Sequence, residues 1–317
     1  MAMKRAGTTE GLGRESTAVD TAAQRTPAPL ATRAGTSLWT RRFRRFRRNR
    51  LSVIGAAIIV LLILVAVVGP FVAPYPEDAT GAVHMSQRLR APSMDHLMGT
   101  DEVGRDVFSR LLIGSRLSLG AGLIVLVVAT VIGTLFGVVS GFFGGKVDLL
   151  VQRITDVFLT VPGLILAMAV AAALGPSLVN VVLAISLTWW PGYSRLTRGE
   201  VLRTSEEVFV EAARAIGAPR HRIILRHVLP NIATPILVKS TMDIGFAVLT
   251  LASLGFIGLG SQPPTPDWGK MIADGRGYLP ESWWLTVFPG IAIFLTVFGF
   301  NLLGDGIRDV FDPRARD

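Results

Sequence analysis

Ionisable side chains inside an apolar stretch are the first residues of this chain whose types and spacing could do chemistry. Lys239 and Asp243 stand four residues apart within residues 231–259, where no other charge occurs. This spacing places both on one face of a helix, where they can form an ion pair. A charge at such a depth normally faces protein or water. Either the pair lines a solute passage or its gate, or Lys239 reaches the interface while helix packing satisfies Asp243.

The residue types give little support to other chemistries. The chain has no cysteine, and its four histidines follow no metal-ligand spacing. Gly144-Gly145-Lys146 is not a phosphate-binding loop, because that motif requires glycine where Ser140 stands and serine or threonine where Val147 stands. No nucleophile–base set occurs in a plausible pocket. We therefore expect no enzyme activity, no cofactor and no metal in this chain, and no ATP binding through such a loop.

The composition indicates a membrane protein. Half of the 317 residues are hydrophobic and 17% are charged, whereas soluble domains carry about 25% charged residues. Several apolar runs approach the ~20 residues that cross a bilayer as a helix. The sequence therefore predicts an all-α polytopic membrane protein with six transmembrane helices. These are expected at about residues 51–73, 117–143, 157–174, 178–193, 231–259 and 285–303.

The net charge of +9 resides entirely in residues 1–50, where twelve basic residues accompany three acidic ones. Residues 1–38 lack periodic apolar positions and are predicted to be a disordered cytoplasmic tail. Residues 39–50 are predicted to be a basic segment on the lipid headgroups. This bias places the N-terminus in the cytoplasm and does not indicate nucleic-acid binding. Six spans then place residues 311–317, the C-terminus, in the cytoplasm as well.

The first outer loop is expected at residues 74–116. Apolar residues recur at helical spacing in residues 107–112, which predicts an amphipathic helix along the outer interface. The charged residues of this loop are interpreted as structural ion pairs and helix caps rather than as an acid–base pair. They are Asp101, Arg105, Asp106 and Arg110.

A ladder of glycines follows in the second span. Gly133, Gly137 and Gly141 stand four apart on one helical face, which predicts a close approach to a neighbouring helix. Residues 146–156 are expected to be a short inner loop. Together, residues 117–310 form the membrane core.

The long polar segment at residues 194–230 carries more arginine than glutamate, which places it in the cytoplasm. Ala212, Ala213 and Gly217 leave little bulk on one helical face. Gly217 and Pro219 interrupt the helix, so two short helices meeting at a bend are predicted. Such a face suits docking into a groove of another protein, and the alternative is a plain linker between spans.

Two stretches resemble a known family. Glu211-Ala212-Ala213, Gly217 and Leu229-Pro230 resemble the EAA loop of ABC-importer permeases. The pattern His-x-Met-Gly-Thr-Asp-x-x-Gly-Arg-Asp-x-x-Ser-Arg at residues 96–110 is similar to the second, C-type permease of the dipeptide/oligopeptide/nickel family. The resemblance covers about residues 40–314.

The resemblance implies a type I ABC-importer transmembrane domain in the bacterial cytoplasmic (inner) membrane. The implied solutes are di- or oligopeptides, with nickel complexes as the alternative. The implied partners are a homologous B-type permease, two ABC ATPase subunits and an extracytoplasmic solute-binding protein, in contact with membrane lipid. Glu211, Ala212, Ala213, Gly217, Leu229 and Pro230 would couple the chain to the ATPase.

Two other classes of protein account for the sequence less completely. An ion-coupled secondary transporter would carry ionisable residues near the midplane. Only Lys239 and Asp243 fit that description, and the basic loop would have no role. A membrane scaffold without transport explains neither the loop nor the pattern at residues 96–110.

Overall fold

The structure is a computed structural model that describes residues 46–47 and 49–311, all within one unit, Trp39–Asp317. The predictions for residues 1–38, for most of residues 39–50 and for residues 312–317 lie outside the described residues. In the described part, helices and loops occur without any named strand, and Thr100 and Asp106 form one isolated bridge. The all-α prediction is confirmed.

Four helical segments of the described chain are long and apolar enough to cross a membrane. They are α2 (Arg50–Val72), α3 (Val107–Phe143), Arg220–Ile257 and α11 (Trp284–Phe311). The third comprises α8 (Arg220–Ile223), the π-helical turn η3 (Ile224–Val228) and α9 (Leu229–Ile257).

A bent pair supplies a fifth candidate span. Helices α4 (Gly145–Thr160) and α5 (Gly163–Leu174) meet at 87° and pass the same test together. The sixth predicted span, residues 178–193, lies in α6 (Leu178–Ser205), a helix of 28 residues that is about 42 Å long at 1.5 Å per residue. Helix α6 does not pass the same test, so the described residues contain four candidate spans, or five with the bent pair, of the six predicted.

Helices extend beyond the predicted spans. The separate amphipathic helix predicted at residues 107–112 was wrong, because these residues are the first turns of the continuous helix α3. Val107, Ser109 and Arg110 are buried there, since protein rather than lipid headgroups surrounds this end of α3. Similarly, α6 continues to Ser205 and α11 to Phe311, well past the predicted ends at 193 and 303.

The predicted inner loop at residues 146–156 was also wrong. These residues form most of α4, and the break lies later, at Val161 and Pro162. A residue before proline avoids the helical region, and Val161 is extended at φ −98° and ψ 133°. Proline therefore ends α4 and redirects the chain into α5.

The core is built on the contact between α3 and α6, which is the most extensive in the described chain. The glycine ladder makes it possible, as predicted. A Cβ at Gly133 would meet the Tyr193 Cβ, and one at Gly137 would lie 2.6 Å from the Ser194 carbonyl oxygen. Helix α9 packs on α3 and α11, and α2 packs on α11 and α3.

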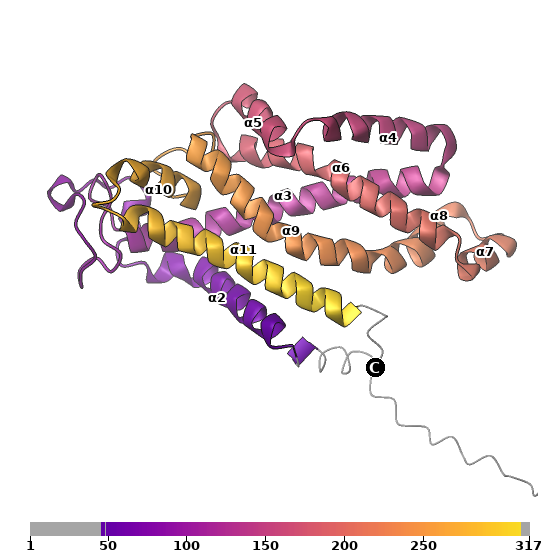
Figure 1. Cartoon of the computed structure of the whole chain (residues 1–317), viewed down its shortest axis with the longest axis horizontal. Helices are drawn as coiled ribbons and strands as arrows, with labels where there is room; N and C mark the ends of the chain where they lie inside the picture. The colour runs from indigo at the N-terminus through magenta and orange to yellow at the C-terminus, as the bar shows by residue number, and fades with distance from the viewer. Residues whose placement is uncertain (1–45, 48, 312–317) are drawn as a thin grey trace, which may run out of the picture. The chain divides into compact units, whose positions relative to one another are not determined.

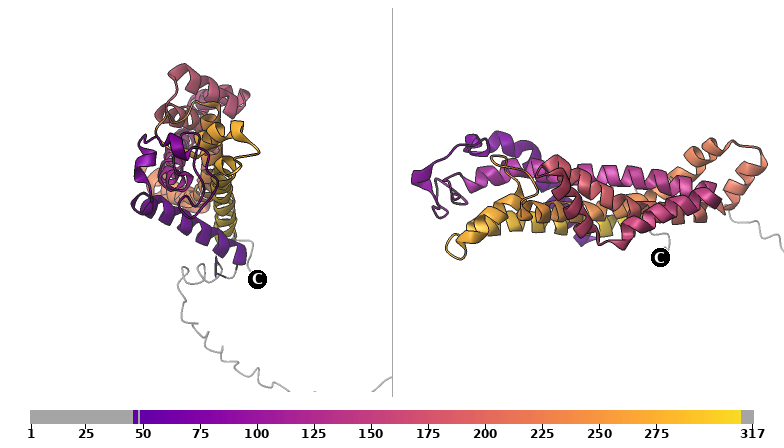
Figure 2. Two further views of the ribbon diagram at one scale, coloured as in Figure 1. Left: turned by 90° about the vertical axis from the view of Figure 1, so that its left-hand side faces the viewer. Right: turned by 90° about the horizontal axis from the view of Figure 1, so that it is seen from above.

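The helices run between two ends that carry different segments (Figure 1). One end, the loop end, holds residues 73–106 and α10 (Trp268–Gly275) with the loops around it. The opposite end, the tip, holds α7 (Val208–Ala215) and α8, and Figure 2 shows the same separation from above. Asn49 donates a hydrogen bond of 3.0 Å to Asp309, which joins the start of α2 to the end of α11. Short turns complete the fold at η1 (Pro76–Ala79), η2 (Met85–Gln87) and η4 (Arg276–Tyr278).

Candidate functional site

The segment at the tip has the predicted bend. Helix α7 ends at Ala215, and α8 begins at Arg220 after Pro219, which is its N-cap. Between them Gly217 has φ +79°, a left-handed conformation that glycine adopts without steric cost. The Gly217 and Ala218 amides donate to the carbonyls of Arg214 and Ala213 at 2.9 and 3.0 Å, which closes the end of α7.

Two sides of α7 have different surroundings. Val210 and Ala213 are buried in a hydrophobic cluster of the chain itself. Its other members are Val138, Val201, Ile223, Val228, Ile232 and Ile236. Ala213, one of the predicted coupling residues, is thus only 6% exposed and packs within this chain, and its part in coupling stays a prediction.

The other side of α7 and its C-cap is an exposed apolar surface that we call the tip face: Val208, Phe209, Ala212 and Ile216. Leu225, in η3, is exposed as well. The Val208 and Ile216 side chains are 78% and 84% exposed. Glu211 and Gly217 are exposed on the same segment. At the start of α9, Pro230 is exposed and Leu229 is half-buried. Sequence reasoning missed Val208, Ile216 and Leu225, although bulky apolar residues in a strongly basic loop were a usable signal.

Arginines attach this segment to the end of α3. The Arg214 guanidinium lies 5.9 Å from the centre of the Phe142 ring, and that of Arg220 lies 6.0 Å from the Phe143 ring. Cations in such positions are attracted by the aromatic face. These contacts connect α7 and the start of α8 to the C-terminal end of α3.

An ion pair missed by sequence reasoning joins α4 to α6 near the tip. Arg198 donates two hydrogen bonds of 2.6 Å, from Nε to Asp148 Oδ1 and from Nη2 to Asp148 Oδ2. Ser140 on α3 also donates to Asp148, and Gln152 donates to Ser140 at 2.9 Å. Three helices thus share one polar cluster, which fixes their register because a bidentate pair has a specific geometry.

The charged residues of the fifth predicted span form the predicted ion pair. Lys239 Nζ lies 2.8 Å from Asp243 Oδ2, with the two side chains 39% and 17% exposed. Tyr193 on α6 donates to the same carboxylate oxygen at 2.7 Å, and Lys239 Nζ lies 5.3 Å from its ring centre. Sequence reasoning missed Tyr193, because it is 50 residues away. The pair thereby connects α9 to α6.

The pattern at residues 96–110 is a buried electrostatic cluster. Asp106 accepts hydrogen bonds from the Ser109 amide at 2.7 Å and thus caps α3, while His96 Nδ1 lies 3.0 Å from its other oxygen. Arg105 Nε donates to Asp101 at 2.6 Å. Burial and the neighbouring charge of Asp101 raise the pKa of the Glu102 carboxyl. The interpretation as ion pairs and caps is confirmed.

The chain matches two family models. The model described as "Binding-protein-dependent transport system inner membrane component" matches residues 133–317, and "N-terminal TM domain of oligopeptide transport permease C" matches residues 37–92.

Individual relatives agree with these models. The chain is 49% identical to a probable D,D-dipeptide transport system permease protein, DdpC, of Escherichia coli K12, over 84% of this chain and 88% of that one. It is 41% identical to the dipeptide transport system permease protein DppC of Alkalihalophilus pseudofirmus, over 92% and 94% of the two chains. A glutathione transport system permease protein, GsiD, of Escherichia coli O157:H7 is 43% identical over 88% and 91%.

A solved structure shares the fold. An inward-facing structure of the MetNI methionine ABC transporter superposes with a TM-score of 0.53 at 20% identity, covering 64% of this chain and 96% of that one. The two sequence stretches that suggested a permease are thus supported by the whole chain and by its fold. The chain belongs to the family of inner-membrane components of binding-protein-dependent transport systems and carries the N-terminal transmembrane domain of C-type oligopeptide transport permeases.

Proposed function

We propose that this chain is one of two permease subunits of an ABC importer for short peptides and that its tip face seats on an ATPase subunit. The tip face carries this proposal. It presents four apolar side chains next to Glu211 and Gly217 on a bent helix pair, with nothing of the described chain covering Val208 or Ile216. An exposed apolar patch of this kind marks a protein–protein contact.

The solute class follows from the relatives. Those named above are described as permeases for D,D-dipeptides, dipeptides and glutathione, and all of these are short peptides. The proposed assembly contains a B-type permease as the second half of the pathway, two ATPases that bind ATP and Mg, and an extracytoplasmic binding protein. Lys239 and Asp243 are proposed to line the pathway or its gate.

The geometry supplies a route for force. When the ATPases close, they displace α7, which moves with the end of α3 through Arg214 and Arg220. Helix α3 packs closely on α6 through the glycines of α3, and Arg198 connects α6 to α4. The helices therefore respond as a group, which alternates the access of the pathway between the two sides.

Substitution of Ile216 by glutamate tests the docking. This side chain is 84% exposed, so the change leaves the packing of the chain intact, while a carboxylate placed unpaired in an apolar interface is costly. We expect the purified complex to lose its ATPase subunits and uptake to fall. The control is Glu206→Ala, exposed between α6 and α7 and outside the tip face. Full ATPase retention with full uptake in Ile216→Glu would refute the proposal.

A further inference from the structure

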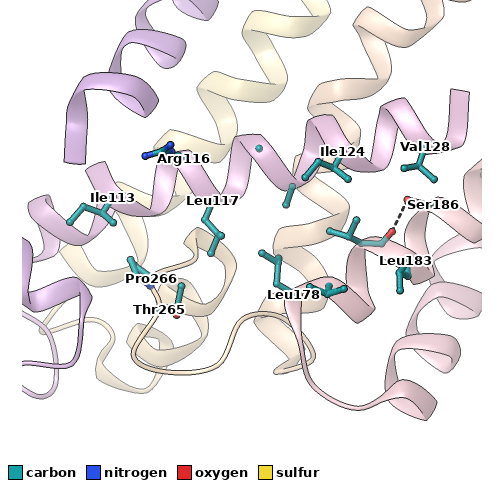
Figure 3. Close-up of a pocket in the computed structure, with 14 residues that line it drawn as sticks. Ile113, Arg116, Leu117, Ile124, Val128, Leu178, Leu183, Ser186, Thr265 and Pro266 are labelled. Atoms are coloured by element: carbon teal, nitrogen blue, oxygen red, sulfur yellow. Dashed lines mark hydrogen bonds between the residues drawn. The ribbon is translucent and has the colours of Figure 1, made fainter. Parts of the chain in front are cut away.

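Two apolar cavities border neighbouring faces of α3 near the loop end. The first, about 660 Å³, lies between α3, the first turns of α6 and residues 265–266 (Figure 3). The second, about 610 Å³, lies between α3 and helices α2, α9 and α11. Apart from Arg116, the α3 residues that line the first cavity between Ile113 and Val128 are apolar, over a length of about 22 Å. Cavities of this size and polarity suit hydrocarbon.

Arg116 and Gly120 are the residues that line both cavities. They stand four apart, so they form one line along α3, and the two cavities lie on either side of that line. A Cβ at Gly120 would meet no atom within 4 Å. The surface of α3 therefore has a depression at Gly120, between the two cavities and about one helical turn from Arg116.

Arg116 also stands at a specific depth. It is the last charged residue of α3 before an uncharged run that continues to Gly145, and this run exceeds the ~30 Å of the hydrocarbon core. Arg116 therefore lies where hydrocarbon meets headgroups. Its side chain is exposed, and no ion pair or side-chain hydrogen bond joins it to the described part of the chain.

We propose that a diacyl phospholipid binds across α3, with its phosphate on Arg116 and one acyl chain in each cavity. A guanidinium matches a phosphate with two parallel charge-assisted hydrogen bonds. Hydrocarbon chains fill apolar cavities without loss of hydrogen bonds, and a two-chain molecule accounts for two cavities that meet at one charge. The lipid belongs to the leaflet on the loop-end side.

The test is lipid retention by the intact transporter complex, measured by native mass spectrometry in mild detergent with phosphatidylglycerol, phosphatidylethanolamine or diacylglycerol added. We expect wild type to hold either phospholipid, and Arg116→Gln to hold it about tenfold more weakly, because charge-assisted hydrogen bonds are lost. Diacylglycerol has no phosphate and should bind both proteins equally. Inorganic phosphate alone should not compete.

Gly120→Leu tests the acyl sites separately, because it fills the depression at Gly120 while it keeps the charge. Its matched control is Gly192→Leu on α6, where a Cβ also meets no atom within 4 Å and which lines neither cavity. We expect the first variant alone to release phospholipid. Equal retention by wild type and Arg116→Gln would overturn the proposal. So would loss of the second permease from Arg116→Gln with phospholipid unchanged, since this face would then contact that subunit.

Discussion

The pair between Arg198 and Asp148 gives the sharpest prediction about force transfer. Replacing Arg198 by alanine removes two hydrogen bonds of 2.6 Å and leaves the carboxylate with Ser140 as its remaining partner. A second arginine–carboxylate pair, Arg203 with Glu200 at 2.9 Å, lies on the same helix. It joins two residues of one helix turn and crosses no helix contact. Arg203→Ala is therefore the matched control.

The two ion pairs differ in expected strength, which distinguishes Arg198→Ala from Arg203→Ala. Arg198 and Asp148 are 33% and 20% exposed, so solvent screens their interaction only in part. Two charge-assisted hydrogen bonds at about 1.5 kcal/mol each give about 3 kcal/mol, or a shift of about a hundredfold in the equilibrium between joined and separated α4 and α6. Arg203 is 65% exposed, and exposed pairs contribute about 1 kcal/mol or less, at most about fivefold.

The assay is peptide uptake per ATP hydrolysed by the complete transporter in proteoliposomes. We expect Arg198→Ala to hydrolyse ATP while its uptake per ATP falls by tenfold or more, and Arg203→Ala to resemble wild type. The exchanged pair Asp148→Arg with Arg198→Asp should recover part of the coupling. Equal uptake per ATP in both alanine variants would refute the idea that α4 moves with α6.

Three further results are expected. Asp243→Asn should lower uptake at unchanged assembly if the pair with Lys239 lines the pathway, and unchanged transport kinetics would exclude that role. Gly217→Asp should uncouple ATP hydrolysis from transport because it adds a carboxylate at the docking surface. Asparagine at position 217 tolerates the positive φ as well as aspartate does but carries no charge, so Gly217→Asn should uncouple transport less than Gly217→Asp. Equal defects in the two variants would indicate backbone strain rather than the added charge. Gly137→Leu should abolish assembly because its Cβ would lie 2.6 Å from the Ser194 carbonyl, whereas Gly163→Leu in open space should assemble normally when both complexes are purified.

Spans could be predicted where charge is absent, but neither their ends nor a bend within one could: the predicted span at residues 157–174 contains the 87° bend between α4 and α5. Residues 51–73 coincide almost completely with α2, because lipid contact requires an apolar helix for its whole length. Outside the hydrocarbon that requirement ends, and polar residues continue a helix just as well. No helix end could therefore be predicted at 193 or 303, and α6 and α11 continue past these residues to Ser205 and Phe311.

Among the candidate site residues, contacts within one helix or turn could be predicted and contacts between helices could not. The bend at Gly217 and the pair Lys239–Asp243 depend on residues within one or two turns, so their spacing was sufficient. The partners Tyr193 and Arg198 approach their carboxylates from 50 residues away. Such contacts follow from how the helices pack, which periodicity alone does not determine.

The glycine ladder explains why these distant partners meet at all. At Gly133 and Gly137 the backbones of α3 and α6 approach so closely that no side chain fits between them, which leaves one register for the two helices. That register places Tyr193 toward α9 and Arg198 toward α4, each on a different side of α6. The two polar contacts therefore bind further helices to a pair that is already aligned. In the proposed mechanism, a force applied at α7 therefore crosses from α3 to α6 through packed backbone, and side chains carry it at the two ends, Arg214 and Arg220 onto α3 and Tyr193 onto Asp243.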